Sequence, residues 1–201
     1  MQDCNIMIPN FLKREPFLEY FQIIDKCAKY EEKLVINNSF PPNVVYLLQT
    51  FFLNAKSNVD IFTKNFPSFF QSEDLADAAE GFLSRDFSSN TLNEHKIRLA
   101  YQSDLPEKRV LSENKFLERL VFNPRYKSQI EIYDANKLDM SGGGVLNFQI
   151  ADSKFFRYDF CNPSFAVADF GDKKNAKKLQ DCFNLIVSSS KKLDVGSYCA
   201  N

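Results

Sequence analysis

The sequence has few of the residues from which common active sites are built: it contains one histidine, no tryptophan and five cysteines. The cysteines are an odd number, lie far apart and include no Cys-x-x-Cys pair, which indicates reduced structural thiols. Together with the single histidine, this pattern excludes a structural zinc site. We therefore predict a protein without a bound metal or cofactor.

An excess of charge of either sign is also missing. Lysine and arginine number 25 and aspartate and glutamate 26, so the formal net charge is −1. Such a chain has no overall positive field that would hold it on a polyanion. Binding of nucleic acid would need a local basic patch.

Long hydrophobic runs are absent as well. No stretch approaches the roughly 18 consecutive apolar residues that a membrane helix requires. The N-terminus also lacks the basic region followed by an apolar region that marks a secretory signal. We predict a cytoplasmic protein that does not bind membranes.

The signatures of several enzyme classes do not occur. The run Gly142, Gly143 and Gly144 lacks the GxxxxGK[ST] spacing of a phosphate loop, and it leads into a strand where such a loop would open a helix. No GxSxG elbow presents a serine nucleophile. The aspartates fit no calcium-binding spacing. These patterns leave no catalytic residue that we can assign.

What the sequence does contain is a folded protein of 201 residues, 44% of them hydrophobic. Residues 10–34 place apolar side chains three and four apart, as in an amphipathic helix, and residues 44–55 are apolar nearly all round, as in a buried helix. We predict that residues 1–57 form a helical segment packed on the main domain. Its Phe, Tyr and Leu side chains either complete the core or form a surface for a partner.

Strands and helices alternate from residue 58 onward. The expected strands are 58–66, 96–102, 129–135, 145–152, 153–160 and 164–170, the fourth and fifth joined by an Asp152-Ser153 turn. The expected helices follow Ser72, Ser112 and Asp172, and the last covers 173–193. This order predicts an α/β domain over 58–193, with a mixed, partly parallel sheet and helices on both faces. Residues 194–201 are predicted to be a disordered tail.

Three features of residues 58–193 occur in a familiar order. A lead-in of three strands alternating with two helices is followed by "LNFQIADSKFFRYDF", an apolar strand with an aspartate turn and a return strand. The closing unit is "SFAVADFGDKKNAKKLQDCFNLIVSSS", a strand, a small polar turn and a helix with a central phenylalanine. In this order the segment resembles one half of a phospholipase D-like domain. The resemblance implies the α/β architecture described above.

Catalytic members of that family carry His-x-Lys, four further residues and Asp; the histidine attacks a phosphodiester and the lysine holds phosphate oxygens. With Asp152 aligned to the motif aspartate, the histidine position falls on Val145 and the lysine position on Asn147. A register shifted by two residues offers Asn147 and Gln149. Amide side chains form hydrogen bonds but are not nucleophiles near neutral pH. The resemblance therefore implies a domain without its catalytic pair.

The resulting hypothesis is a non-catalytic interaction or regulatory module that binds a protein partner or forms a homodimer, as part of a bacterial defence or mobile-element system. A competing hypothesis is a nuclease or phosphodiesterase whose site forms across a homodimer. It requires His95 to lie near Asn147, Gln149 and Lys154. A third is nucleic-acid binding without catalysis, which requires Arg157 and the basic helix to share one face.

Two groups of residues are candidates for binding. On the hairpin and its preceding loop they are Gly142, Gly143, Gly144, Asn147, Gln149, Lys154 and Arg157. The glycines act either as an anion-binding nest or as a flexible connection, and Arg157 either contacts a phosphate or base or pairs with an acid. On the last helix, Lys173, Lys174, Lys177 and Lys178 form either an anion-binding patch or a solvated face.

Overall fold

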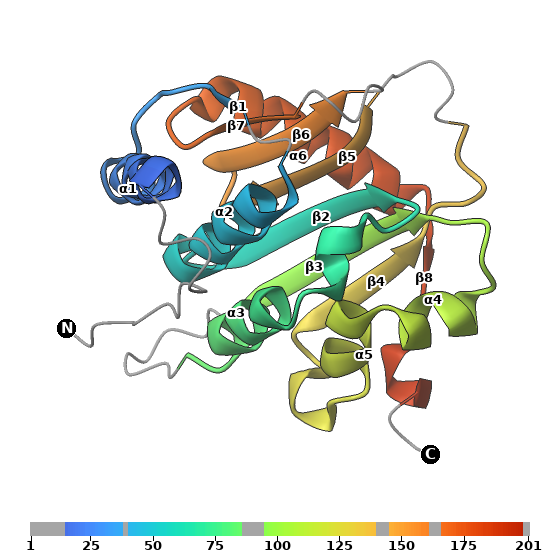
Figure 1. Cartoon of the computed structure of the whole chain (residues 1–201). Helices are drawn as coiled ribbons and strands as arrows, with labels where there is room; N and C mark the ends of the chain where they lie inside the picture. Colours follow the sequence, from blue (N-terminus) through green and yellow to red (C-terminus); the bar gives the residue numbers. More distant parts are fainter. Residues whose placement is uncertain (1–14, 38–39, 86–94, 140–144, 161–165, 199–201) are drawn as a thin grey trace, which may run out of the picture.

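The computed structural model describes residues 15–37, 40–85, 95–139, 145–160 and 166–198. Its strands form one sheet in the order β1-β7-β6-β5-β2-β3-β4-β8. The strands are β1 (Ile36–Asn37), β2 (Asn58–Lys64), β3 (Lys96–Gln102), β4 (Ile130–Asp134), β5 (Val145–Ala151), β6 (Phe155–Phe160), β7 (Ala166–Asp169) and β8 (Lys191–Lys192). Strands β2, β3 and β4 are parallel, and every other pairing is antiparallel (Figure 1).

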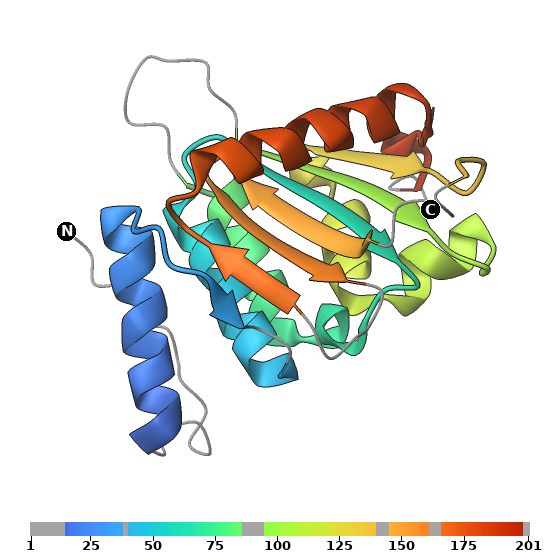
Figure 2. The same cartoon turned by 90° about the horizontal axis from the view of Figure 1, so that it is seen from above.

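Helices cover both faces of this sheet. The α-helices are α1 (Glu15–Tyr30), α2 (Pro41–Asn54), α3 (Glu73–Leu83), α4 (Glu107–Glu113), α5 (Lys115–Val121) and α6 (Lys173–Ser188), and the 3-10 helices are η2 (Ser68–Gln71), η3 (Pro124–Tyr126) and η4 (Val195–Tyr198). Helix α6 lies across one face, and α2 to α5 lie on the other (Figure 2). The predicted α/β architecture, with a mixed sheet between helices, is therefore confirmed.

The hydrophobic core is divided by the sheet. On the α6 side, Phe62, Phe148 and Ile150 of the sheet pack against Phe183 and Ile186 of the helix. A larger apolar cluster on the opposite side joins the sheet to α2, α3 and α5. Side chains on neighbouring positions of a strand point to opposite faces, so each central strand contributes to both clusters.

Two predicted helix caps and the predicted hairpin turn are confirmed. Ser72 caps α3, accepting a hydrogen bond from the Leu75 amide at 3.4 Å. Asp152 and Ser153, with φ angles of 52° and 54°, are the central residues of the turn between β5 and β6, which the Lys154 amide closes by donating to the Ala151 carbonyl at 2.9 Å. Asp172 caps α6 through the Asn175 amide at 3.2 Å.

Other boundaries differ from the prediction. Ser112 does not begin a helix but lies inside α4, and Asn114 caps the following helix, α5, through the Leu117 amide. Helix α6 ends at Ser188 and not at residue 193, because Lys191 and Lys192 pair with β4 as strand β8. Cys182, on α6, is exposed. Part of the tail for which we predicted disorder is the helix η4, with Val195 buried.

The first two helices have different environments. Helix α2 lies in the larger core, with Leu47 and Phe51 fully buried. Helix α1 packs on α2: the rings of Phe21 and Tyr46 stack at 4.0 Å, and the Tyr46 hydroxyl donates to Asp25 at 2.8 Å. None of the helices in the described residues is long and apolar enough to cross a bilayer.

Candidate functional site

The side chain at the aligned lysine position, Asn147, is held in a hydrogen-bond network. Asn147 lies on β5 opposite Thr63, at the carboxyl end of β2. Its Oδ1 accepts from the Thr63 hydroxyl at 2.8 Å and from the Lys64 amide at 2.9 Å. Its Nδ2 donates to Asp159 at 3.1 Å. Both polar atoms of the Asn147 amide therefore form hydrogen bonds within the protein. Gly142, Gly143, Gly144 and the Val145 side chain lie outside the described residues.

Arg157 and Gln149 extend this network. The Arg157 guanidinium lies 2.6 Å from Asp159 and donates to the Gln149 Oε1 at 3.3 Å. It also lies over the Phe69 ring at 5.4 Å. Only 2% of Arg157 is exposed. This burial lowers the pKa of the guanidinium, and the charge of Asp159 offsets the shift only in part. Arg157 therefore forms the ion pair that one of our two interpretations predicts. The described residues offer no hydrogen-bond partner to the Gln149 Nε2.

Asp152, aligned with the motif aspartate, lies at the other end of the hairpin. Its carboxylate accepts from the amides of Lys56, Ser57 and Asn58 at 2.6 to 3.0 Å, where β2 begins. Lys154 is at the same edge of the sheet and pairs with Glu31 at 2.5 Å. Hydrogen bonds from Lys154 and Lys173 lower the pKa of Glu31. These charges join the hairpin to the start of β2 and to the chain after α1.

His95 lies at this same edge and not near Asn147. It directly precedes β3, whose Lys96 is level with Asn58, whereas Asn147 is level with Thr63. A separation of five residues along β2 corresponds to about 17 Å. The His95 ring packs edge-on against the Phe82 ring at 4.7 Å, and His95 is 8% exposed. The enzyme hypothesis required His95 to lie near Asn147, Gln149 and Lys154. Lys154 is at the same edge as His95 but Asn147 is not, so within one chain this requirement is not met.

The burial of His95 makes stability depend on pH. Desolvation lowers the pKa of His95 below its usual value of 6.5, and the nearby charge of Arg85 lowers it further. Protons then bind the unfolded chain more strongly than the folded one, so the contribution of His95 is complete above about pH 6.5 and is lost as the pH falls toward the folded pKa. In urea denaturation between about pH 7 and 5.5, we expect a smaller loss for His95→Phe than for the natural protein. Equal losses would contradict this.

The arrangement of β5, β6 and α6 on a partly parallel sheet can be compared with known structures. The match to TrmBL2, an archaeal chromatin protein that binds DNA, has a TM-score of 0.54 at 12% identity and covers 86% of this chain and 60% of that one. Nuc from Salmonella typhimurium, a phospholipase D family member, gives 0.54 at 12% identity over 81% of this chain and 99% of that one. The chain has a phospholipase D-like fold.

A third match of the chain is NucT from Helicobacter pylori, with a TM-score of 0.50 at 13% identity, covering 81% of this chain and 99% of NucT. The chain thus spans nearly all of Nuc and NucT but about three fifths of TrmBL2. No protein-family model and no curated protein sequence matches it. At these identities the likeness establishes the fold alone.

The nucleic-acid hypothesis required the lysines of α6 to share a face with Arg157, and they do not. Tyr158 packs into the cluster beneath α6, so its neighbour Arg157 points to the opposite face, where Phe69 lies. Lys173 pairs with Glu31 at 3.0 Å and Lys177 with Asp181 at 2.7 Å. Lys174 and Lys178 are exposed. The described residues also contain no group of three or more His, Cys, Asp or Glu side chains placed to hold a metal.

Apolar side chains are exposed on α1 and on the segment that leads from it to β1. Ile23 and Tyr30, seven residues apart on one stripe of the helix, are 45% and 60% exposed. Leu34 and Val35 follow at 44% and 68%. We call these four residues the α1 surface. Val35 also borders a groove of about 380 Å³ between α6 and strands β6 and β7. The sequence predicts the apolar character of the N-terminal helices but does not separate the buried side chains from these.

Proposed function

We propose that this phospholipase D-like domain is a non-catalytic module that binds a protein through its α1 surface. The observation that carries the proposal is the network around Asn147. At the position where catalytic members of the family present a lysine, this chain has a neutral amide whose hydrogen bonds go to Thr63, Lys64 and Asp159. A side chain already bonded within the protein gives a phosphodiester neither a nucleophile nor a positive charge.

The α1 surface supports a protein as the partner. Large apolar side chains that stand together at the surface commonly mark sites of association. Of the cations around it, Lys26 pairs with Glu32 and Lys33 with Asp172, both within 3.3 Å, and the Lys29 ammonium lies over the Tyr30 ring at 5.2 Å. A nucleic acid would need unpaired cations. The partner is either a second copy of this chain or another protein.

Two measurements test this proposal. The oligomeric state of the purified protein, by size-exclusion chromatography with light scattering, detects a homodimer. Co-purification from the native host at near-physiological salt, with and without nuclease, detects another protein. We expect a stoichiometric dimer or partner that resists nuclease, and a loss of about tenfold in association for Ile23→Glu/Tyr30→Glu.

Leu185→Glu is the matched control, because Leu185 is an apolar residue of α6 that is 71% exposed and lies outside the α1 surface. It should leave association unchanged. Equal retention of the partner by the α1 double variant would refute the proposed surface. Recovery of nucleic acid without protein would instead favour nucleic-acid binding. A partner encoded beside this chain in a defence or mobile-element cassette would support the proposed setting.

A further inference from the structure

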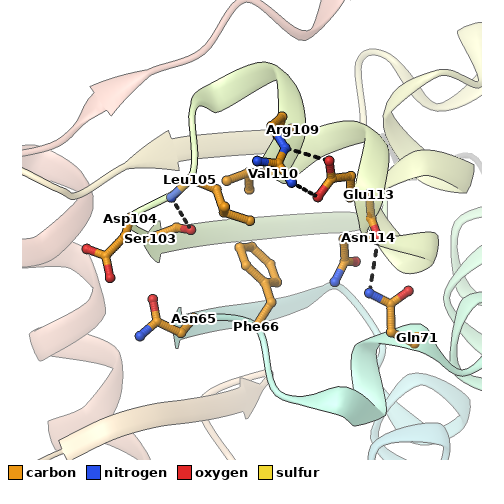
Figure 3. Close-up of a pocket in the computed structure, with 10 residues that line it drawn as sticks. All are labelled: Asn65, Phe66, Gln71, Ser103, Asp104, Leu105, Arg109, Val110, Glu113 and Asn114. Carbon is orange, nitrogen blue, oxygen red and sulfur yellow. Dashed lines mark hydrogen bonds and ion pairs between the residues drawn. The ribbon is translucent and has the colours of Figure 1, made fainter.

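A pocket of about 390 Å³ opens at the carboxyl ends of β2 and β3. Asn65 and Phe66, which follow β2, form one side of it, and the loop from Ser103 to Leu105, which follows β3, forms another (Figure 3). Open α/β sheets bind ligands in crevices outside the carboxyl ends of their strands, and pockets of this volume accommodate small molecules. The pocket shares no lining residue with the Asn147 network or the α1 surface.

The middle of the pocket is an apolar slot. The ring of Phe66 and the side chain of Leu105 face each other across it, and Val110 lies behind them (Figure 3). The Phe66 ring is held in place because it contacts the rings of Phe70 at 5.6 Å and Tyr101 at 5.7 Å. Two apolar walls on opposite sides favour a flat ring with two apolar faces over a puckered sugar ring with hydroxyl groups around it.

The backbone that positions Phe66 is strained. Asn65 and Phe66 have φ angles of 58° and 34°, and a bulky residue such as phenylalanine rarely adopts a positive φ. Strain of this kind persists where the surrounding structure enforces it, and it is concentrated at ligand-binding sites. Here it directs the Phe66 ring into the pocket.

Asn114 places an unused hydrogen-bond donor beside this ring. Its Oδ1 caps α5 by accepting from the Leu117 amide at 3.0 Å. Its Nδ2 is buried and has no partner in the described part of the chain, and the residue is 4% exposed. In Figure 3 this amide lies next to Phe66. A buried donor without an acceptor is unfavourable, so a ligand oxygen or ring nitrogen that reached it would relieve that cost.

We propose that this pocket binds a free nucleobase or nucleoside. The base lies between Phe66 and Leu105 and accepts a hydrogen bond from the Asn114 Nδ2 through a carbonyl oxygen or ring nitrogen. Stacking of a base on an aromatic ring tolerates any base, and the acceptor directed at Asn114 provides the preference among them. The site is independent of the proposed function, since it neither uses nor blocks the α1 surface.

The test is an NMR titration of the ¹⁵N-labelled full chain with adenosine, guanosine, cytidine and uridine, and with D-glucose as the comparison ligand. We expect saturable shifts of pocket amides with at least one nucleoside at a Kd of about 1 mM or tighter, and none with glucose. Asn114→Ser keeps a capping hydroxyl but removes the Nδ2 donor, whose position the shorter serine side chain does not reach, and should weaken binding about tenfold.

A pair of exposed leucines supplies the controls. Leu105→Trp fills the slot from its rim and should abolish binding, whereas Leu185→Trp on α6 should leave the Kd unchanged. Leu105 and Leu185 are 41% and 71% exposed, so both variants are expected to fold. The two variants therefore test the proposed site even if Asn114→Ser does not fold. No saturable shift with any nucleoside up to about 10 mM, binding of glucose alone, or an unchanged Kd in Leu105→Trp would overturn the proposal.

Discussion

Replacing Gly171 with alanine is expected to lower the free energy of unfolding by about 3 kcal/mol or more. Gly171 joins β7 to α6 where the chain after α1 crosses it. A Cβ atom on Gly171 would lie 2.4 Å from the Lys33 amide nitrogen and 2.5 Å from the Glu31 carbonyl oxygen. Both are backbone atoms, so no side-chain rotation relieves the overlap. The midpoint of urea denaturation, at an unchanged denaturant slope, measures this loss in the free energy of unfolding.

Gly81→Ala is the matched control for that substitution. Gly81 is an exposed residue inside α3, and a Cβ atom there would have no neighbour within 4 Å. Alanine restricts the unfolded chain and favours the helix, so this variant should gain about 0.5 to 1 kcal/mol. Opposite signs for the two glycines are the expected result. A loss at Gly171 no larger than that of an ordinary surface substitution would show that the chain after α1 moves aside.

Asp60→Ala is expected to cost about 3 to 5 kcal/mol, because it leaves the charge of Arg98 without its acid partner. Asp60 is fully buried on β2, and Arg98 of β3 donates to both its oxygens, at 2.7 and 2.6 Å. The Gln180 amide of α6 donates to the same carboxylate at 2.5 Å. The carboxylate therefore links β2 and β3 to α6, and its removal should also loosen this helix.

The control for Asp60 is Asp181→Ala on the outer side of α6. Asp181 pairs with Lys177 at 2.7 Å, but both side chains are more than half exposed, so the expected change is below about 0.5 kcal/mol. Denaturation gives the free energies, and hydrogen exchange of α6 amides reports the loosening of the helix. A cost for Asp60→Ala similar to that for Asp181→Ala would mean that water replaces the lost partners.

The elements predicted well from the sequence are those with strong local signals. Strand β3 has the predicted bounds, Lys96–Gln102, and the hairpin turn lies at Asp152 and Ser153, since alternation and turn residues act over short distances. The predicted start of α5, after Ser112, was wrong. Ser112 and Asn114 are both good capping residues, and only packing selects Asn114. Strand β8 depends on pairing with the distant β4, which leaves no local signal.

The candidate site was predictable in part for the same reason. Alternation along β6 correctly separates Arg157 from Tyr158, but it does not say which face is covered by α6. For that reason the sequence could not decide the third hypothesis, which required Arg157 to share a face with the lysines of α6. The placement of His95 depends on strand register. Lys96 pairs with Asn58 at the start of β2, so His95 lies at one end of the strands and Asn147 at the other. The pocket beside Phe66 combines two loops and α4, whose proximity arises only from the parallel pairing of β2 and β3.

The two outermost strands limit how copies of this protein can associate. Strands β1 and β8 each have two residues, and β8 consists of Lys191 and Lys192, both exposed. Edges this short, one of them carrying like charges, are poor templates for adding a strand from another molecule. Growth of the sheet from one molecule into the next, the route toward fibrous aggregates, is therefore disfavoured at both ends. Assembly is directed to helical surfaces, where side-chain shape selects the partner.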